Sequence, residues 1–173
     1  FKPLKKVGTI TAIQRIVMVF KRAGLEQVVV VCGEDDTEQL AARMNLVYLY
    51  GNRKAEMFDN VKVGLAYLQD KCAAALITHT DVPLFTVETI NKLITSKKAA
   101  AVVPSYCGDA GHPLLLRSKH FPKILSYTGD GGLEEAVKQS GLQRSLVEVG
   151  DKGVITDLQV EEDYEYLLHE HSL

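Results

Sequence analysis

The sequence lacks the marks of several functional classes. Its formal net charge is −2, so it offers no broad positive field for a nucleic acid backbone. Its 3 cysteines show no C-x-x-C spacing, which argues against a disulfide framework or a structural zinc site. No apolar run approaches the roughly 20 residues of a membrane-spanning helix, and no secretory leader is visible. We therefore expect a cytoplasmic protein that binds neither nucleic acid nor membrane.

Three familiar catalytic and binding signatures are missing as well. The sequence contains no G-x-x-x-x-G-K-[S/T] phosphate loop and no G-x-G-x-x-G dinucleotide fingerprint. It also contains no G-x-S-x-G nucleophile elbow. These absences exclude the P-loop NTPases, the classical dinucleotide-binding domains and the serine hydrolases that use such an elbow.

The apolar residues that are present alternate between two periods. Ile13, Val17 and Phe20 recur at helical spacing within 9–22, and 28–31 is a run of four valines, as in a strand covered on both faces. Further strands are expected at 46–50, 73–77, 99–103, 114–116, 146–149 and 154–156, and further helices at 36–44, 60–68, 86–97, 133–139 and 161–169. The pattern predicts one α/β domain over 1–173, a three-layer, mostly parallel sheet flanked by helices with a short antiparallel addition.

Asp81 is the first candidate for a functional side chain. It lies directly after the apolar strand 73–77, and ligands of such sheets bind outside the carboxyl ends of the strands. Mg²⁺ prefers oxygen ligands and takes one or two protein carboxylates together with phosphate oxygens. Asp81 could equally be a turn or cap residue of the helix that begins near Thr86, and the residues alone leave both interpretations open.

Asp130 is the second candidate. Gly129 and Gly131 flank it, which lets the backbone approach a ligand closely, and the helix that follows offers free N–H groups to an anion. An ordinary Asp-Gly turn that caps this helix is the alternative interpretation.

Two further polar residues could contact a substrate. His112, after Gly111, can donate or accept a hydrogen bond, although a histidine beside a proline is more often structural. Lys2 belongs to a small basic cluster that could neutralise phosphate charge or could be a solvated surface cluster.

Several of these segments resemble the MobA-like NTP transferase family. Lys2 matches the lysine that ends the family's signature L-A-A-G-x-S-x-R-M-G-x-x-K, and 80–84 resembles its G-D-M/Q-P-L segment. Asn52 with 57–65 is similar to the stretch N-x-x-x-x-G-M-x-x-S-x-x-x-G-L.

The most specific resemblance is to the molybdenum cofactor cytidylyltransferase branch of that family. The segments 111–117 and 127–132 resemble its G-H-P-V-L-L and G-D-x-G motifs, which occur in the same order. The segment 157–164 is similar to the closing D-I-D-T-P-E-D-Y.

The resemblance implies a Rossmann-like, GT-A-type nucleotidyltransferase. Such an enzyme would transfer a nucleotide from CTP or GTP, most specifically CMP from CTP, to a phosphorylated acceptor such as molybdopterin and release pyrophosphate. Mg²⁺ would be held by Asp81 and Asp130, and Lys2 would contact phosphate. Asn52, Gly111 and His112 would contact the nucleotide or the acceptor.

The chain also departs from the family pattern. The strand and Gly-rich loop expected ahead of Lys2 do not occur in the sequence, and we expect them to precede Phe1 in the protein. Thr80 replaces a glycine, and Asp59 and Asn60 replace serines. Two alternatives therefore stay open: a relative that uses another NTP or a sugar-phosphate acceptor, and a non-catalytic nucleotide-binding regulatory domain. A fused further domain and a homodimer are open as well.

Overall fold

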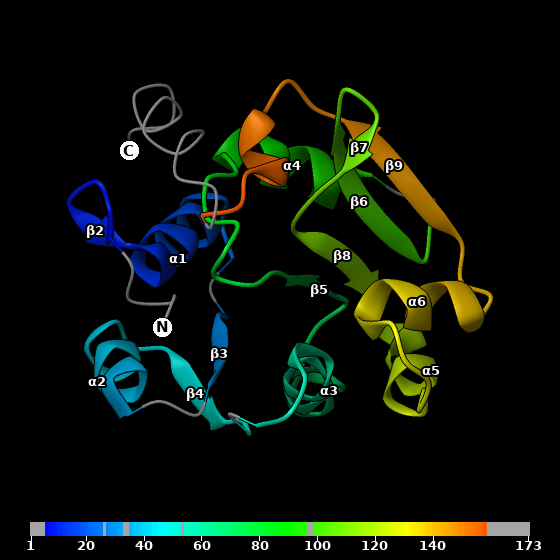
Figure 1. The fold of residues 1–173 in the computed structure, drawn as a ribbon, viewed down its shortest axis with the longest axis horizontal. Coiled ribbons are helices and arrows are strands. Elements are labelled where there is room, and N and C mark those ends of the chain that lie inside the picture. The colour runs from blue at the N-terminus through cyan, green and yellow to red at the C-terminus, as the bar shows by residue number, and fades with distance from the viewer. Residues whose placement is uncertain (1–5, 26, 33–34, 53, 97–98, 159–173) are drawn as a thin grey trace.

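The computed structural model describes residues 6–25, 27–32, 35–52, 54–96 and 99–158 (Figure 1). In chain order the elements are β1 (Lys6–Val7), β2 (Ile10–Thr11), α1 (Ala12–Arg22), β3 (Val29–Cys32), α2 (Asp35–Arg43), β4 (Val47–Tyr50), α3 (Met57–Leu68), β5 (Ala74–Ile77), α4 (Val87–Thr95), β6 (Ala101–Tyr106), β7 (Asp109–Ala110), β8 (Leu114–Arg117), η1 (Ser118–His120), α5 (Phe121–Leu125), α6 (Gly132–Gln139), β9 (Arg144–Glu148) and η2 (Lys152–Ile155).

The larger sheet has the strand order β5-β8-β6-β7, with β9 on the other side of β6. Strands β6 and β9 are parallel, whereas β8 runs antiparallel to both β5 and β6. The α/β class is therefore confirmed. The antiparallel strand predicted at 114–116 is β8, which lies inside the sheet between β5 and β6, and both of these strands run opposite to it. The hairpin from β6 into β7 turns at Cys107 and Gly108, which both have positive φ, and thereby sends the chain back into the sheet.

Helices cover both faces of this sheet and give the predicted three layers. Successive side chains of a strand point to opposite faces. Thus Val102 of β6 and Leu115 of β8 belong to a buried cluster with α1 and α4, while Val103 and Leu116 belong to a second cluster with α3, α5 and α6. All four side chains are buried, so β6 and β8 in the middle of the larger sheet are covered on both faces.

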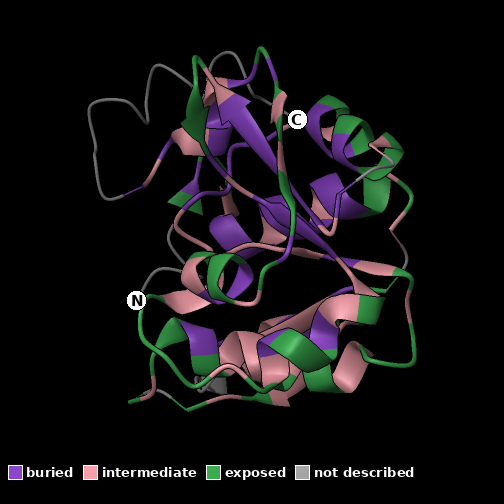
Figure 2. Cartoon of the chain, turned by 90° about the vertical axis from the view of Figure 1, so that its right-hand side faces the viewer, coloured by how far each residue is buried: buried purple, intermediate pink, exposed green. Residues whose placement is uncertain are grey.

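Strands β3 and β4 form a separate parallel pair, with Val29 opposite Val47 and Cys32 opposite Tyr50. The predicted run of four valines is a strand here, but every residue of β3 is only half-buried. Figure 2 shows the same contrast: buried residues gather in the upper part of the molecule, and intermediate and exposed ones dominate the lower part. The smaller sheet is thus less completely covered than the larger one.

Local signals explain where several elements begin. Thr11 caps α1 through a capping box, because its hydroxyl accepts from the Gln14 N–H while the Gln14 side chain accepts from the Thr11 N–H. The predicted strand at 154–156 was wrong, because this segment is the short 3₁₀ helix η2, whose first turn is capped by Asp151. Strands β1, β2 and β7, with η1 and α5, were not predicted, and the helix predicted at 161–169 lies outside the described residues.

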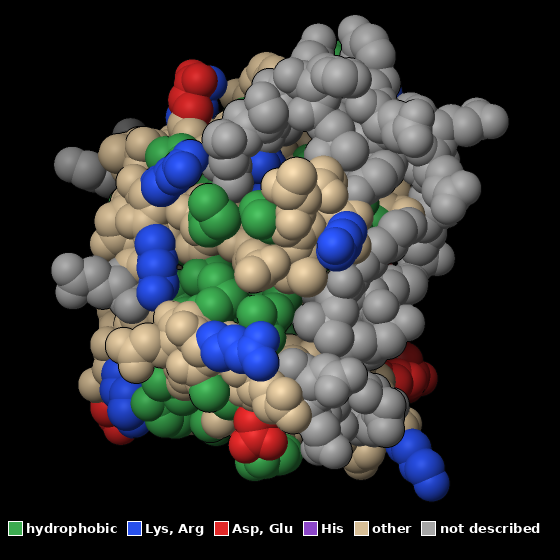
Figure 3. All heavy atoms as spheres, turned by 90° about the vertical axis from the view of Figure 1, so that its left-hand side faces the viewer, with side chains coloured by type: hydrophobic (Ala, Val, Ile, Leu, Met, Phe, Trp, Pro, Cys, Tyr) green, Lys and Arg blue, Asp and Glu red, His purple; other side chains and the backbone are tan. Residues whose placement is uncertain are grey.

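Two surface properties follow from the described part of the chain. No helix in it has both the length and the apolar character needed to cross a bilayer. On the face shown in Figure 3, lysine and arginine side chains are spaced apart around hydrophobic atoms instead of forming a continuous basic band where the residues are described.

Candidate functional site

The candidate site is built around the Asp81 turn, residues 78–86, which joins the end of β5 to the start of α4. The Asp81 side chain is only 15% exposed, and its Oδ2 lies 3.9 Å from Nδ1 of His79. The backbone carbonyl of Asp81 accepts a hydrogen bond from the N–H of Leu158, at 2.8 Å. The turn is therefore held by a residue from near the C-terminal end of the described chain, and Asp157 comes directly before that residue.

His112 lies against the same turn. Its ring is 4.5 Å from that of His79, centroid to centroid, and nearly perpendicular to it. Burial lowers the pKa of His112 to about 4, and the neighbouring His79 adds to this, while the charge of Asp157 opposes it. His112 is thus a neutral imidazole near pH 7, able to donate one hydrogen bond and to accept another. Two histidines and two acidic residues meet at the end of β5.

A buried arginine supports the turn from α1. Arg15 is 4% exposed; its Nε donates to the carbonyl of Pro83 at 2.9 Å, and its Nη2 donates to that of Leu84 at 3.5 Å. Burial lowers the pKa of Arg15, and the negative charge of Asp151 counteracts this effect. The guanidinium thereby fixes two successive backbone carbonyls after Asp81, which limits how the turn can move.

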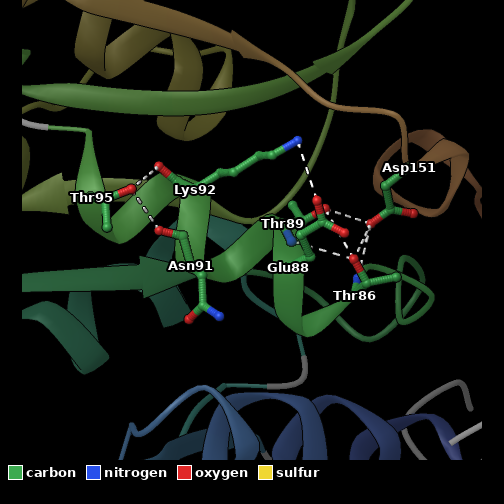
Figure 4. A network of polar contacts seen from close by, with 7 residues as sticks. All are labelled: Thr86, Glu88, Thr89, Asn91, Lys92, Thr95 and Asp151. Carbon is green, nitrogen blue, oxygen red and sulfur yellow. Dashed lines mark hydrogen bonds and ion pairs between the residues drawn. The ribbon is translucent and has the colours of Figure 1, made fainter.

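Asp151 also supports the turn, where it meets the start of α4 (Figure 4). Its Oδ2 accepts hydrogen bonds from the Thr86 N–H at 2.9 Å and from the Thr89 hydroxyl at 2.7 Å. Its Oδ1 accepts from the Gly153 N–H at 2.9 Å. The carboxylate is 7% exposed, so one buried charge ties η2 to the first turn of α4. In the same view, Lys92 and Glu88 form an ion pair on the exposed side of the helix.

Two glycines let η2 pack between these segments. A Cβ on Gly111 would overlap the carbonyl oxygen of Val154, and a Cβ on Gly153 would overlap that of Leu84. The N–H of His112 donates to the Val154 carbonyl at 2.8 Å. The structure therefore gives Gly111 a packing role that positions His112, whereas its contact with nucleotide or acceptor stays a prediction.

Asp130 lies elsewhere, in the exposed loop between α5 and α6. This loop is anchored to α3: Nζ of Lys62 donates to the carbonyl of Tyr127 and lies 4.7 Å from the ring centroid of Phe58. The Tyr127 hydroxyl in turn donates to the Asp130 carbonyl at 2.8 Å. The loop is thus well supported, and the predicted metal role of Asp130 stays a prediction.

Asn52 follows β4 and organises a turn. Its side-chain oxygen accepts from the Lys54 N–H at 2.9 Å, and its own N–H donates to Oδ1 of Asn60 at 3.1 Å. A Cβ on Gly51 would overlap the Asn60 amide, so Asn60 and Gly51 fit together closely. Asn60 stands where the family pattern has a serine. Its amide therefore shapes the end of β4. Lys2 lies outside the described residues.

The structure thus brings together Asp81 and His112 of the predicted residues, and it adds His79, Asp157 and Arg15. His79 is adjacent to the recognised segment 80–84 and Asp157 opens the recognised closing segment, so proximity in the sequence was an available signal for both. Arg15 interrupts the apolar face of α1, which was the available signal for a buried partner.

The acidic residues near the turn fit a hard divalent cation. Within the described ranges, no three His, Cys, Asp or Glu side chains are grouped closely enough to hold a metal by themselves. A cation of the Mg²⁺ type does not need such a cage, because it takes one or two carboxylates and completes its shell with phosphate oxygens and water. The half-buried Asp81 with Asp157 nearby is a donor set of that kind.

Comparisons with known proteins give a family match and a set of similar folds. Residues 1–145 match the family model of the MobA-like NTP transferase domain. The fold is similar to that of Rv0371c from Mycobacterium tuberculosis H37Rv, at 19% identity and a TM-score of 0.77, with 97% of this chain and 88% of that chain covered. A second structure of Rv0371c, a complex with manganese, matches at 20% identity and a TM-score of 0.75 over 97% of this chain and 91% of that one.

A synthase is among the similar structures too. The 4-diphosphocytidyl-2C-methyl-D-erythritol synthase matches at 18% identity and a TM-score of 0.76, with 96% of this chain and 92% of that chain covered. A search of curated protein sequences finds no match.

Proposed function

Because the chain belongs to the MobA-like NTP transferase family and is therefore a nucleotidyltransferase, we propose that it transfers CMP from CTP to a phosphorylated acceptor such as molybdopterin and releases pyrophosphate. The observation that carries this proposal is the meeting of His112 with the Asp81 turn at the end of β5. These are the segments that resemble the G-H-P and G-D-x-P-L motifs, and they lie where ligands of such sheets bind.

The reaction needs positioning and charge neutralisation more than covalent help from the protein. An oxygen of the acceptor phosphate attacks the α-phosphorus of the nucleotide in line with the leaving pyrophosphate. A new P–O bond forms to the acceptor, and the bond between the α- and β-phosphates breaks. Lys2 neutralises negative charge on the departing phosphates, and neutral His112 orients nucleotide or acceptor by donating a hydrogen bond.

Mg²⁺ is the proposed cofactor, held by Asp81 and Asp130. When bound, it neutralises phosphate charge and orients both reactants. Asp157 is a second candidate for the partner carboxylate of Asp81, since it lies close enough to His112 to influence its pKa. Asn52 and Gly111 complete the proposed contacts to nucleotide and acceptor. The manganese in the Rv0371c complex supports a divalent cation in proteins of this fold.

Binding of Mn²⁺, measured by electron paramagnetic resonance in the presence of CTP, separates the two candidate carboxylates. Asp81→Asn should abolish the bound signal, and whichever of Asp130→Asn and Asp157→Asn weakens it identifies the second carboxylate. An unchanged signal in Asp81→Asn would refute the metal site itself.

The proposed activity is tested with a nucleotide panel. CTP, GTP, ATP and UTP are incubated with Mg²⁺ and with molybdopterin or a sugar phosphate, and pyrophosphate release is measured. Release that requires CTP and molybdopterin supports the proposal. Release with another nucleotide or with the sugar phosphate assigns a related transferase. Nucleotide-induced thermal stabilisation without any release would instead indicate a regulatory domain.

A further inference from the structure

The helix α3 contacts two parts of the proposed site that are far apart in the sequence. In its first turn, Oδ1 of Asn60 accepts the N–H of Asn52, in the turn after β4. Two residues further on, Nζ of Lys62 donates to the carbonyl of Tyr127, in the segment between α5 and α6. The helix α3 lies beside both α5 and α6 (Figure 1). One helix is therefore attached to two of the segments that carry predicted contact residues.

Tyr127 is the residue through which this attachment reaches Asp130. We call the segment 126–131 the Asp130 loop. The Tyr127 ring packs edge-on against Phe58 of α3, with 6.0 Å between the ring centroids, and its hydroxyl donates to the carbonyl of Asp130 at 2.8 Å. A Cβ on Gly129 would lie 2.5 Å from that hydroxyl oxygen, so a side chain at this position would displace the tyrosine. These contacts hold the loop by its backbone and its tyrosine, and none of them uses the Asp130 carboxylate.

Lys62 is the charged member of this anchor. Its ammonium group donates to the Tyr127 carbonyl and lies 4.7 Å from the centroid of the Phe58 ring, and the residue is half-buried. Partial burial of an ammonium group is costly unless such partners replace water. An apolar side chain would pack against both rings without that cost but would not bond the carbonyl. The lysine therefore fixes where the backbone of the loop lies, in addition to filling space.

We propose that Lys62 is a positioning residue, which holds the Asp130 loop in place for the phosphorylated acceptor. This inference rests on the proposed function, in which Asp130 contributes a carboxylate to the site. Asp81 and Asn60 are held by other contacts, so loss of the Lys62 ammonium group releases the loop and leaves the nucleotide side of the site in place. Removal of this group should therefore weaken the binding of the acceptor and not that of the nucleotide.

Limited proteolysis without ligand tests the anchor itself, because chymotrypsin cuts after tyrosine only where the chain opens locally. In Lys62→Met, cleavage after Tyr127 should become at least about tenfold faster. Lys71→Met is the matched control: Nζ of Lys71 donates to the carbonyl of Tyr67 at 2.9 Å and lies 4.4 Å from the centroid of the same ring. It removes the same kinds of contact just after α3 and should leave cleavage after Tyr127 unchanged. Mass spectrometry identifies each cleaved bond, and circular dichroism establishes that both variants are folded.

Steady-state pyrophosphate release separates the two substrates. The nucleotide and the acceptor that support release, expected to be CTP and molybdopterin, are varied in turn. Lys62→Met should raise the KM of the acceptor at least about fivefold and change the KM of CTP by less than about twofold. Lys62→Arg keeps a donor for the Tyr127 carbonyl and should restore most of the loss, and Lys71→Met should change neither constant. In an Asp130→Asn background the effect of Lys62→Met should disappear, because both changes act on the same carboxylate.

Three outcomes would overturn the inference. The bond after Tyr127 could be cut equally fast in both lysine variants, the KM of CTP could rise as much as that of the acceptor, or the losses of Lys62→Met and Asp130→Asn could add independently. Each would reduce Lys62 to an ordinary stabilising contact. A wild-type protein that releases no pyrophosphate with any nucleotide would refute the proposed function and the acceptor role with it, whereas proteolysis would still decide whether Lys62 anchors the loop.

Discussion

The two sheets of this protein differ in how completely their strands are covered, although both contain strongly apolar strands. In the larger sheet, β6 is buried along five of its six residues, whereas each of the four residues of β3 is only half-buried. The four valines of 28–31 are no less hydrophobic than the residues of β6. The difference arises from neighbours: within the part of the chain that the structure describes, β6 has strands on both sides, and β3 pairs with β4 alone. Burial of a strand is thus decided by what pairs with its edges as much as by its own side chains.

The largest expected effect is on turnover, and it concerns Asp81, which follows the end of β5. Asp81→Asn should reduce turnover by a factor of about 100 or more, because a carboxylate of the proposed metal site is lost. Asp70→Asn, at an exposed position ahead of the same strand, should leave turnover unchanged. Steady-state pyrophosphate release measures both. Near-normal turnover in Asp81→Asn would remove this residue from the proposed site.

A matched pair of truncations tests the contrast between the sheets. Leu116 of β8 is fully buried, so Leu116→Ala should lower the free energy of unfolding by about 2–5 kcal/mol. Leu49 of β4 is half-buried, and Leu49→Ala should lower it by only about 1 kcal/mol. Urea unfolding monitored by circular dichroism gives both values. Equal losses would mean that the smaller sheet is packed as well as the larger one.

Asp151 should contribute more to stability than any exposed charge beside it. In Asp151→Asn, an NH2 group replaces one of the two oxygens and faces the N–H of either Thr86 or Gly153, so we expect a loss of about 1.5–3 kcal/mol. Glu88→Gln changes an exposed member of the Lys92 ion pair and should alter stability by less than about 0.5 kcal/mol. The same urea titration compares them, and similar losses would argue against a structural role of the buried carboxylate.

A pH dependence of stability is expected from His112. Its pKa is about 4 in the folded state and near 6.5 in the unfolded chain, so the unfolded state binds more protons between these values. Stability should therefore fall as the pH is lowered from about 6.5 towards 4, by at most roughly 1.4 kcal/mol for each pKa unit. His112→Gln should flatten the stability profile in this window. A steeper or unchanged profile in the variant would assign the dependence to other groups.

The elements with strong local signals could be predicted from the sequence, and those defined by distant contacts could not. The helix α1 follows from its apolar spacing and capping residue, and β5 follows from its apolar run. The segment 154–156 has β-branched residues and was expected to be a strand, but Asp151 folds it into η2 through contacts with α4. Such a long-range hydrogen bond has no signature in the local pattern.

The candidate site shows the same division. Asp81 was found because it directly follows an apolar strand, and His112 because it lies in a recognisable segment. Their proximity to each other, and to Asp157, depends on the packing of η2 against Gly111 and could not be inferred from spacing. The pairing of β3 with β4 was equally invisible, because a run of valines gives no information about which strands flank it.

The hydrogen bond from Leu158 to Asp81 has a consequence for protein synthesis. A ribosome releases the chain from its N-terminus, and the larger sheet can begin to assemble while later residues are still being added. The Asp81 turn, however, receives its contacts from Asp151 and Leu158 only when these two residues have emerged. Nascent chains that stall shortly before this point would hold the Asp81 turn through Arg15 but without Asp151 and Leu158, and a truncation after residue 145 would do so permanently.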